Sequence, residues 1–371
     1  MTGTRSGSFT VSAAIARRPG APFERSQVRL DALKPGEILV RVEACGICHM
    51  DLAAHEFTPL PAVFGHEGVG IVEEVGPNVT RTRPGDRIVM SFGSCGVCPN
   101  CCQSRPYQCD KSWEITFSGR RLDGSPTVFE GDEPVSACFF QQSAFAEWAI
   151  TRQEGVVVVS RASDPTILAA MPCGAMTGVG VVFNQLVVRP GDSLSVFGAG
   201  AVGLSAVMAA RIAGASQIIV SDVNPERLNL ARQLGATHTV DAREGDVARR
   251  IRDVAPRGVR YAIDTSGASA AFGAAVSSLG VGGVLAACIL PQPMNEFRFS
   301  PLELFEKAGA LVSVSFGNSS PQEMIPLMIS LFESGRLPID RLVTTYPFER
   351  INDACADAKR GSVIKPVLMM A

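Results

Sequence analysis

Apolar and polar positions along the first part of the chain follow the two-residue period of β-strands. Glu37–Ala44 places apolar β-formers at alternate positions, and Val69–Val75 and Arg87–Met90 have a similar pattern. Pro84–Asp86 supplies a turn between the last two segments. Because the strands are short and no regular strand–helix alternation joins them, this part predicts a β-rich domain.

The pattern changes after the turn at Arg189–Asp192. Ser193–Phe197 is a short apolar strand, Val202–Ala213 has helical periodicity, and Ile218–Ser221 is a strand again. Asn224, followed by a proline, has the residue types that begin a helix. The alternation continues at Tyr261–Asp264, Ser269–Leu279, Gly283–Ala287 and Met324–Glu333, before a strand–helix–strand tail at Arg341–Met370. Such βαβ units predict an α/β fold with a doubly wound parallel sheet.

Length and composition narrow the classes of protein. A chain of 371 residues fits two domains, and 46% hydrophobic with 19% charged residues favours buried cores over disorder. A net charge of -2 opposes a general nucleic-acid or acidic-membrane binder. The apolar runs are too short to span a bilayer. The polar residues 1–10 lack a signal-peptide core, so we expect a cytoplasmic protein.

The cysteines point to metal binding. There are eleven, an odd number, and without an export signal disulfides explain them poorly. Cys95, Cys98, Cys101 and Cys109 have the spacing C-x2-C-x2-C-x7-C, which lets four thiolates close a tetrahedron around Zn²⁺. This set predicts a structural zinc site with no open position, and Cys102 lies outside it.

Three other segments carry metal-ligand chemistry, although none is convincing alone: Cys45–Asp51 with two cysteines, Gly65–Glu67, and Met171–Gly174. Together they supply two thiolates and the imidazole of His66, the donor set of a catalytic zinc site that keeps its fourth position open. Asp51 is placed to bond the far ring nitrogen of His66 and fix its tautomer. Glu67 is placed to approach the metal or its water.

A nucleotide-binding fingerprint follows the strand Ser193–Phe197. The glycines Gly198, Gly200 and Gly203 form G-x-G-x-x-G at the start of a helix, a turn that brings a pyrophosphate to the helix N-terminus. With Val202 they are the predicted cofactor-binding turn. Asp222 ends the next strand, where a carboxylate binds the ribose 2′-hydroxyl and repels a 2′-phosphate, so NAD(H) is favoured over NADP(H). Arg227, in the following helix, is placed to flank the adenosine ribose.

With both cysteine sets and the fingerprint, the segments Leu60–Gly68, Phe197–Ser205 and Gln233–His238 identify a family. From about Ser12 to its end, the chain resembles the zinc-containing medium-chain alcohol dehydrogenases, and most of all their bacterial aryl-alcohol (benzyl alcohol) branch. The resemblance implies a split GroES-like catalytic domain, residues 1–180 and 318–371, and a Rossmann domain, residues 181–317, with the active site between them. It also implies a homo-oligomer, with a tetramer favoured over a dimer. A strand near Leu285–Ile289 or Leu311–Ser315 would extend a sheet between subunits.

The resemblance also assigns roles. It implies catalytic zinc ligands at Cys48, His66 and Cys173, whereas Cys45 is no ligand in the family pattern. Further positions match by role: Glu67 and Asp51 as the acids beside the ligands, Cys95, Cys98, Cys101 and Cys109 as the structural zinc set, and His49 and Lys365 as contacts of the cofactor pyrophosphate. The implied holoenzyme carries two Zn²⁺ per subunit and NAD(H).

One position departs from the family. Where relatives have Ser or Thr to relay the alcohol proton, this chain has Met50, which has no exchangeable proton, and Ala53 stands where a relay histidine often lies. The main hypothesis is interconversion of an aryl or allylic primary alcohol and its aldehyde, with water, His49 or His55 carrying the proton. The first alternative is reduction of a C=N or conjugated C=C bond. The second is a non-catalytic NAD-binding sensor, against which the retained zinc ligands weigh.

Substrate contacts follow from the resemblance alone. Phe92 lies just before the structural cysteine set and is expected near the substrate, with Trp113 and Phe117 as further aromatic candidates. Each has core packing as an equally good explanation.

Overall fold

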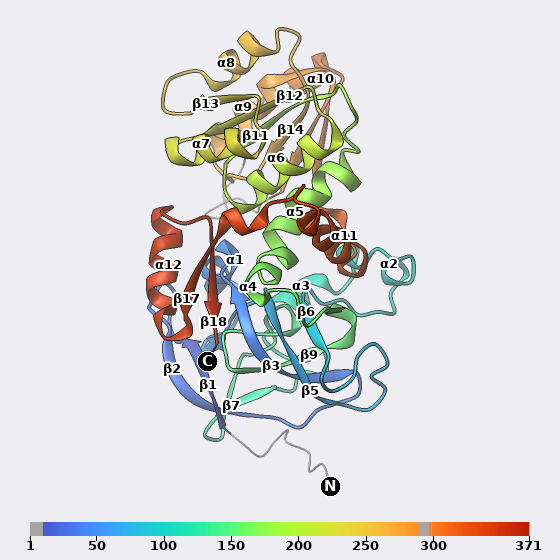
Figure 1. The fold of residues 1–371 in the computed structure, drawn as a ribbon, viewed down its shortest axis with the longest axis vertical. Coiled ribbons are helices and arrows are strands. Elements are labelled where there is room, and N and C mark those ends of the chain that lie inside the picture. Colours follow the sequence, from blue (N-terminus) through green and yellow to red (C-terminus); the bar gives the residue numbers. More distant parts are fainter. Residues whose placement is uncertain (1–9, 289–296, 298, 371) are drawn as a thin grey trace. The chain divides into compact units, whose positions relative to one another are not determined.

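The computed structural model describes residues 10–288, 297 and 299–370, which fall into two compact units (Figure 1). The first unit comprises Met1–Cys173, Ser320–Ile329 and Ile339–Ala371, and the second Gly174–Ser319 and Ser330–Pro338. Two sequence expectations, on the polar residues 1–9 and on Ile289, lie outside the described residues.

The described part of the first unit is built on two sheets. One has the order β4-β1-β2-β7-β8, with β1 (Thr10–Ala16), β2 (Glu24–Leu30), β4 (Ala62–Val63), β7 (Val128–Glu130) and β8 (Glu133–Val135). The other has the order β10-β6-β5-β3-β18-β17, with β9 also on β3: β3 (Glu37–Gly46), β5 (Gly68–Val75), β6 (Arg87–Met90), β9 (Trp148–Arg152), β10 (Val156–Val159), β17 (Val343–Pro347) and β18 (Lys365–Met369). The β-rich first part is therefore confirmed.

Strand β3 organises the second of these sheets. It pairs with β5, β9 and β18, so residues from both ends of the chain meet on it. Eight of its ten residues are buried, which the apolar run at Ile38–Val40 permits. Helices lie in the loops between these strands and in the tail of the chain: α1 (His49–Ala53), α2 (Pro99–Cys102), α3 (Ser112–Phe117), α4 (Pro165–Leu168), α11 (Pro321–Glu333) and α12 (Ile351–Arg360).

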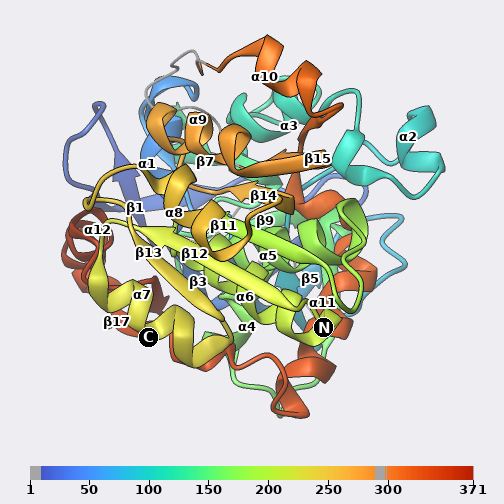
Figure 2. The same cartoon turned by 90° about the horizontal axis from the view of Figure 1, so that it is seen from above.

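The second unit contains a parallel sheet in the order β13-β12-β11-β14-β15-β16 (Figure 2). Its strands are β11 (Ser193–Phe197), β12 (Gln217–Asp222), β13 (His238–Asp241), β14 (Val259–Asp264), β15 (Leu279–Ala287) and β16 (Ala310–Ser313). Its helices are α5 (Met176–Gly180), α6 (Ala201–Ala213), α7 (Pro225–Leu234), α8 (Val247–Val254), α9 (Ser269–Ser278) and α10 (Pro301–Glu306). This is the doubly wound nucleotide-binding order, as predicted.

Helix signals in the sequence are used as expected. The side chain of Asn224 accepts hydrogen bonds from the backbone N–H groups of Glu226 and Arg227 and so begins α7. Gly214, with φ of 81°, ends α6 in the left-handed conformation. One boundary differs from expectation, because β15 begins at Leu279 rather than Gly283. A register irregularity opposite Val259 lets this glycine-rich stretch join the sheet early.

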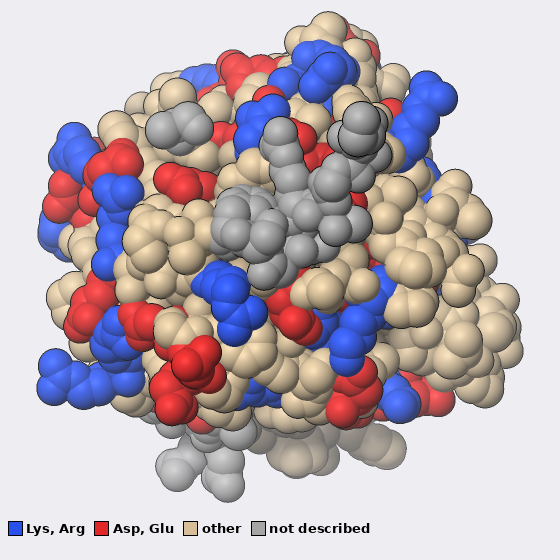
Figure 3. Space-filling model, turned by 90° about the horizontal axis from the view of Figure 1, so that it is seen from below, with Lys and Arg blue, Asp and Glu red and all other residues tan. Residues whose placement is uncertain are grey.

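The surface charges and the lengths of the helices bear on the classes of protein that the composition excluded. On the face drawn in Figure 3, acidic and basic side chains of the described residues are interspersed, without a large patch of one sign. Within the described part of the chain, no helix is both long and apolar enough to cross a membrane.

Candidate metal and nucleotide sites

The four spaced cysteines form one cluster on the loop that contains α2. The sulfur atoms of Cys95, Cys98, Cys101 and Cys109 all lie within 4.8 Å of one another. Backbone N–H groups donate to two of them: Cys95 N to Cys109 Sγ at 3.3 Å and Cys98 N to Cys95 Sγ at 3.4 Å. Such bonds stabilise thiolates, so the donor set fits a closed tetrahedral zinc site. The thiol of Cys102 is exposed and outside the cluster.

A second cluster joins three distant segments of the first unit. Cys48 caps α1 just after β3, His66 lies between β4 and β5, and Cys173 lies in a π-helical turn, Met171–Ala175. One ligand atom from each of these and from Glu67 lies within 4.8 Å of the others. The sequence predicted this convergence from the residue types, and the structure brings the four side chains together.

The distances in the second cluster fit a metal ion. Cys48 Sγ and Cys173 Sγ are 3.9 Å apart, and His66 Nε2 is 3.3 Å from Cys173 Sγ. On a tetrahedron, with metal–sulfur distances of about 2.3 Å and metal–nitrogen distances of about 2.0 Å, two sulfur ligands would be about 3.8 Å apart, and a sulfur and a nitrogen ligand about 3.5 Å apart. Cys45 is fully buried, and its thiol faces the carbonyl of Gly46, so it lies outside the cluster.

Asp51 supports the cluster from behind. Its Oδ1 is 2.8 Å from His66 Nδ1 and accepts from Gly65 N, while Oδ2 accepts from Cys48 N. A proton on Nδ1 leaves the Nε2 lone pair aimed at the sulfurs. Burial lowers the pKa of His66, but the Asp51 carboxylate outweighs it and raises that pKa above its usual value. The carboxylate therefore fixes both ligand-bearing segments.

Glu67 and Lys365 form a buried ion pair beside the cluster. The Lys365 ammonium lies 2.7 and 2.8 Å from the two Glu67 oxygens and 3.3 Å from the carbonyl of Ile47, and both side chains are at most 3% exposed. Gly46 permits this approach, since a Cβ there would lie 2.0 Å from Glu67 Oε2. The sequence proposed a cofactor role for Lys365 but did not foresee this pairing.

The positions discussed for proton transfer differ in environment. His49 is exposed at the start of α1, and Met50 and Ala53 are half-buried. His55 is buried, stacks on Phe64 at 4.7 Å, and has no hydrogen-bond partner for either ring nitrogen among the described residues. Burial lowers the pKa of His55. Of these two histidines, only His49 is exposed to solvent.

The glycine-rich turn has the geometry that its motif requires. Gly198 has φ of 96°, and a Cβ on Gly203 would lie 1.8 Å from the Gly198 carbonyl, whereas a Cβ on Gly200 would meet open space. Asp222 accepts from Ala199 N at 2.6 Å and from Asn224 N at 2.8 Å, so its carboxylate lies against the turn. Val202 and Arg227 lie in the first turns of α6 and α7.

Comparison with known proteins places this geometry in a family. Residues 34–161 match the alcohol dehydrogenase GroES-like domain, and residues 201–334 match the zinc-binding dehydrogenase model. The chain is 38% identical to geraniol dehydrogenase of Castellaniella defragrans over 365 residues, 97% of this chain and 98% of that protein. The chain belongs to the zinc-dependent alcohol dehydrogenases.

Solved structures of similar proteins agree with this family assignment. Benzyl alcohol dehydrogenase from Acinetobacter calcoaceticus superimposes with a TM-score of 0.93 at 36% identity, covering 98% of this chain and 99% of that one. An alcohol dehydrogenase zinc-binding domain protein from Burkholderia ambifaria gives a TM-score of 0.94 at 41% identity, with the same coverage. The predicted family, the fold class and an oxidoreductase activity on small-molecule alcohols are thereby confirmed. Membership implies zinc and a nicotinamide cofactor.

A strained loop that the sequence did not reveal holds the ligand segment of this dehydrogenase. Phe140, Gln141 and Ser143 have φ between 52° and 59°, a conformation costly for residues other than glycine. The Gln142 amide donates to the carbonyls of His66 and Ser91 and accepts from Gly68 N. Because tertiary contacts hold these residues in the left-handed conformation, no local sequence motif predicts it.

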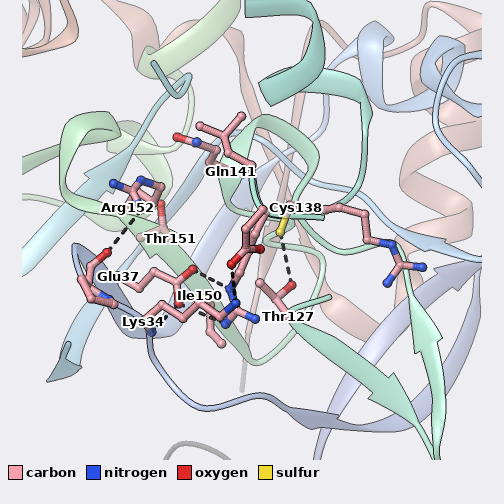
Figure 4. Close-up of a pocket in the computed structure, with 13 residues that line it drawn as sticks. Lys34, Glu37, Thr127, Cys138, Gln141, Ile150, Thr151 and Arg152 are labelled. Carbon is pink, nitrogen blue, oxygen red and sulfur yellow. Dashed lines mark hydrogen bonds and ion pairs between the residues drawn. The ribbon is translucent and has the colours of Figure 1, made fainter. Parts of the chain in front are cut away.

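The cavity shown in Figure 4 is a separate feature of the first unit. It measures about 250 Å³, and Lys34, Glu37, Cys138 and Arg152 are among its lining residues. Several of its charged side chains form ion pairs: Lys34 with Asp123, Arg121 with Glu37 and Asp31, and Arg152 with Glu154. Burial raises the pKa of Cys138 to about 11, so its thiol is unreactive at neutral pH. None of the predicted site residues lines this cavity.

Proposed function

We propose that this dehydrogenase interconverts aryl or allylic primary alcohols and their aldehydes with NAD(H) as cofactor. The observation that carries the proposal is the three-ligand cluster of Cys48, His66 and Cys173, held by Asp51, in a chain with a complete nucleotide fingerprint. The substrate class is supported by the relatives that are named for geraniol and benzyl alcohol.

We further propose two zinc ions per subunit, one in each cysteine cluster. Residues 1–180 and 318–371 would hold both zinc ions, and residues 181–317 would bind NAD(H). When bound, zinc supplies Lewis-acid polarisation of the substrate oxygen, and the nicotinamide exchanges the hydride. The chain's own residues would hold these groups: Asp51 sets the His66 tautomer, the glycine turn would admit the pyrophosphate, and Asp222 would accept a hydrogen bond from the ribose hydroxyl.

The deciding experiment combines zinc content with a substrate screen. Zinc-replete protein is assayed with NAD⁺ and benzyl alcohol, geraniol and ethanol, and with NADH and matching aldehydes, imines and enals. Turnover of the first two alcohols with two zinc ions per subunit supports the proposal. Turnover confined to imines or C=C bonds would favour the reductase, and zinc-poor, inactive protein would favour the sensor.

Met50→Thr tests the proton route. A hydroxyl at position 50 could not pass the proton on, because Ala53 has no group that accepts it. We therefore expect kcat/KM for benzyl alcohol to change less than about tenfold, well below the roughly 100- to 10,000-fold contribution of a proton relay. Met50→Val is the control without a hydroxyl. A gain of about a hundredfold in the threonine variant alone would indicate that alcohols are not the optimised substrate.

Asp222→Asn tests cofactor choice. The change removes a charge that would repel a 2′-phosphate but keeps an oxygen for Ala199 N, so we expect the NAD(H) over NADP(H) preference in kcat/KM to fall about 10- to 100-fold. Asp241→Asn, at the end of the neighbouring strand β13, is the matched control. Equal preferences in wild type and Asp222→Asn would contradict the role of this carboxylate.

We also propose that the protein is a homo-oligomer, and we favour a tetramer over a dimer. Strand β16 is at one end of the parallel sheet, and exposed apolar residues lie on β15, α10 and β16: Val281, Leu302, Phe305 and Leu311. Exposed apolar side chains beside an open strand edge favour association. Light scattering after size exclusion tests the assembly state.

A further inference from the structure

The parallel sheet of the second unit has an acidic residue on each side of its glycine-rich turn. Strand β11, which leads into the turn, lies between β12 and β14 in the sheet (Figure 2). Strand β12 ends at Asp222, and β14 ends at Asp264. Phe197, the last residue of β11, pairs with Ser221 on one side and with Asp264 on the other. The two carboxylates therefore flank the turn at the carboxyl edge of the sheet, where dinucleotides bind.

The two carboxylates differ in their hydrogen bonds. Asp222 uses both oxygens, which accept from Ala199 N and Asn224 N. Asp264 uses only Oδ1, which accepts from the backbone N–H of Ser266 at 3.0 Å and from the hydroxyl of the same residue at 2.7 Å. Asp264 Oδ2 has no hydrogen-bond partner among the described residues, although the residue is 0% exposed. A buried oxygen without a partner destabilises the fold, so its presence calls for an explanation.

The negative charge of Asp264 is not compensated by a basic side chain. Among the described residues, no Lys or Arg forms an ion pair with it, and its hydrogen-bond donors are neutral. Burial raises the pKa of Asp264, and hydrogen bonds from Ser266 and Gly267 oppose that rise only in part. Cys288, whose backbone N–H donates to the Asp264 carbonyl, has a neutral thiol, because burial and the Asp264 charge raise its pKa. A positive charge brought to this edge of the sheet would therefore be stabilised.

The direction of a bound dinucleotide follows from the opposite side of the turn. Asp222 is the proposed partner of the adenosine ribose, on the β12 side. With the pyrophosphate on the turn, the nicotinamide half is expected on the β14 side, where Asp264 lies. The nicotinamide ring is positive in NAD⁺ and neutral in NADH. Of the two carboxylates, Asp264 is the one placed to distinguish the oxidation states.

We propose that Asp264, through its uncompensated negative charge, favours the binding of NAD⁺ over NADH and so adapts this dehydrogenase to alcohol oxidation. This inference rests on the proposed function and adds the preferred direction of its reaction. The side chain is fully buried, so it acts through its charge rather than through contact with the substrate. A higher relative affinity for NAD⁺ lets the oxidised cofactor compete with the NADH that the reaction forms.

Equilibrium binding of three ligands to the zinc-replete protein tests the charge effect. Asp264→Asn removes the charge but keeps the shape of the side chain and an oxygen for Ser266. We expect this variant to raise Kd for NAD⁺ about three- to tenfold and to change Kd for NADH and for ADP-ribose, which lacks the nicotinamide, by less than about twofold. The fluorescence of bound NADH measures its own Kd, and its displacement measures the other two. Asp264→Ser should reproduce the effect, and Asp264→Glu, which retains the charge, should behave like wild type.

The matched control is Asp222→Asn, on the other side of the turn. It should change Kd for all three ligands by a similar factor, because each contains the adenosine ribose. If Asp264→Asn keeps the wild-type ratio of the Kd values for NADH and NAD⁺, or loses affinity equally for all three ligands, the charge effect is overturned. If the wild type binds neither NAD⁺ nor NADH, the proposed function itself fails. If it binds both and the ratio does not depend on the charge at position 264, only this inference fails.

Discussion

Replacing Cys48 with serine is expected to remove one of the two proposed zinc ions per subunit and to lower kcat/KM for benzyl alcohol about a thousandfold. A hydroxyl is a far poorer zinc ligand than a thiolate, and the remaining donors of the cluster are His66, Cys173 and Glu67, whose carboxylate is paired with Lys365. Lewis-acid polarisation is worth several kcal/mol, and about 4 kcal/mol corresponds to a thousandfold in rate. Zinc analysis and steady-state kinetics on the same sample measure both effects.

Two control variants show whether the loss of zinc and activity is specific to Cys48. Cys45→Ser changes a cysteine of the same segment whose thiol lies outside the cluster, so both zinc ions should remain. Cys98→Ser should remove the other zinc and lower the melting temperature, because a closed four-cysteine site contributes folding free energy. A Cys48→Ser protein that still binds two zinc ions would show that Cys48 is not a ligand.

The features that the sequence predicted are those encoded in local patterns. The strand Ser193–Phe197 and the helix that follows the glycines have their own periodicities, and the structure has them at β11 and α6. The four-cysteine spacing lies within fifteen residues, so one loop closes it. For the second cluster, residue types alone indicated the donors without choosing between Cys45 and Cys48, and the family resemblance chose Cys48. The structure shows Cys45 buried on β3, whereas Cys48 is the N-cap residue of α1 and lies in the cluster.

The features that the sequence did not reveal depend on distant contacts. Lys365 and Glu67 meet because β18 pairs with β3, which no local pattern specifies. The left-handed residues at Phe140 and Gln141 carry no glycine or asparagine signal and are held by surrounding side chains. The ring contacts of Phe117 likewise join α3 to Phe139 and Phe140, more than twenty positions later, and no local pattern in the sequence specifies them.

Lys365→Met is expected to destabilise the protein by about 3 to 5 kcal/mol, because it leaves the Glu67 carboxylate buried without its partner. For a unit of this size the melting temperature should fall by about 10 °C. Adding Glu67→Gln removes the uncompensated charge, so the double variant should recover most of the loss even though it lacks both ionic groups. Calorimetry of the zinc-loaded variants measures these shifts.

The matched control is Lys34→Met, which breaks the exposed pair between Lys34 and Asp123. Their side chains are 38% and 55% exposed, so the solvent-screened interaction contributes at most about 1 kcal/mol. The comparison separates burial from ionic pairing as such, since both substitutions remove a lysine ammonium that lies within 3 Å of a carboxylate. If the double variant is as unstable as Lys365→Met, or if Lys365→Met is no worse than Lys34→Met, the pair does not hold Glu67 in place, and the Lys365 ammonium is available for another role.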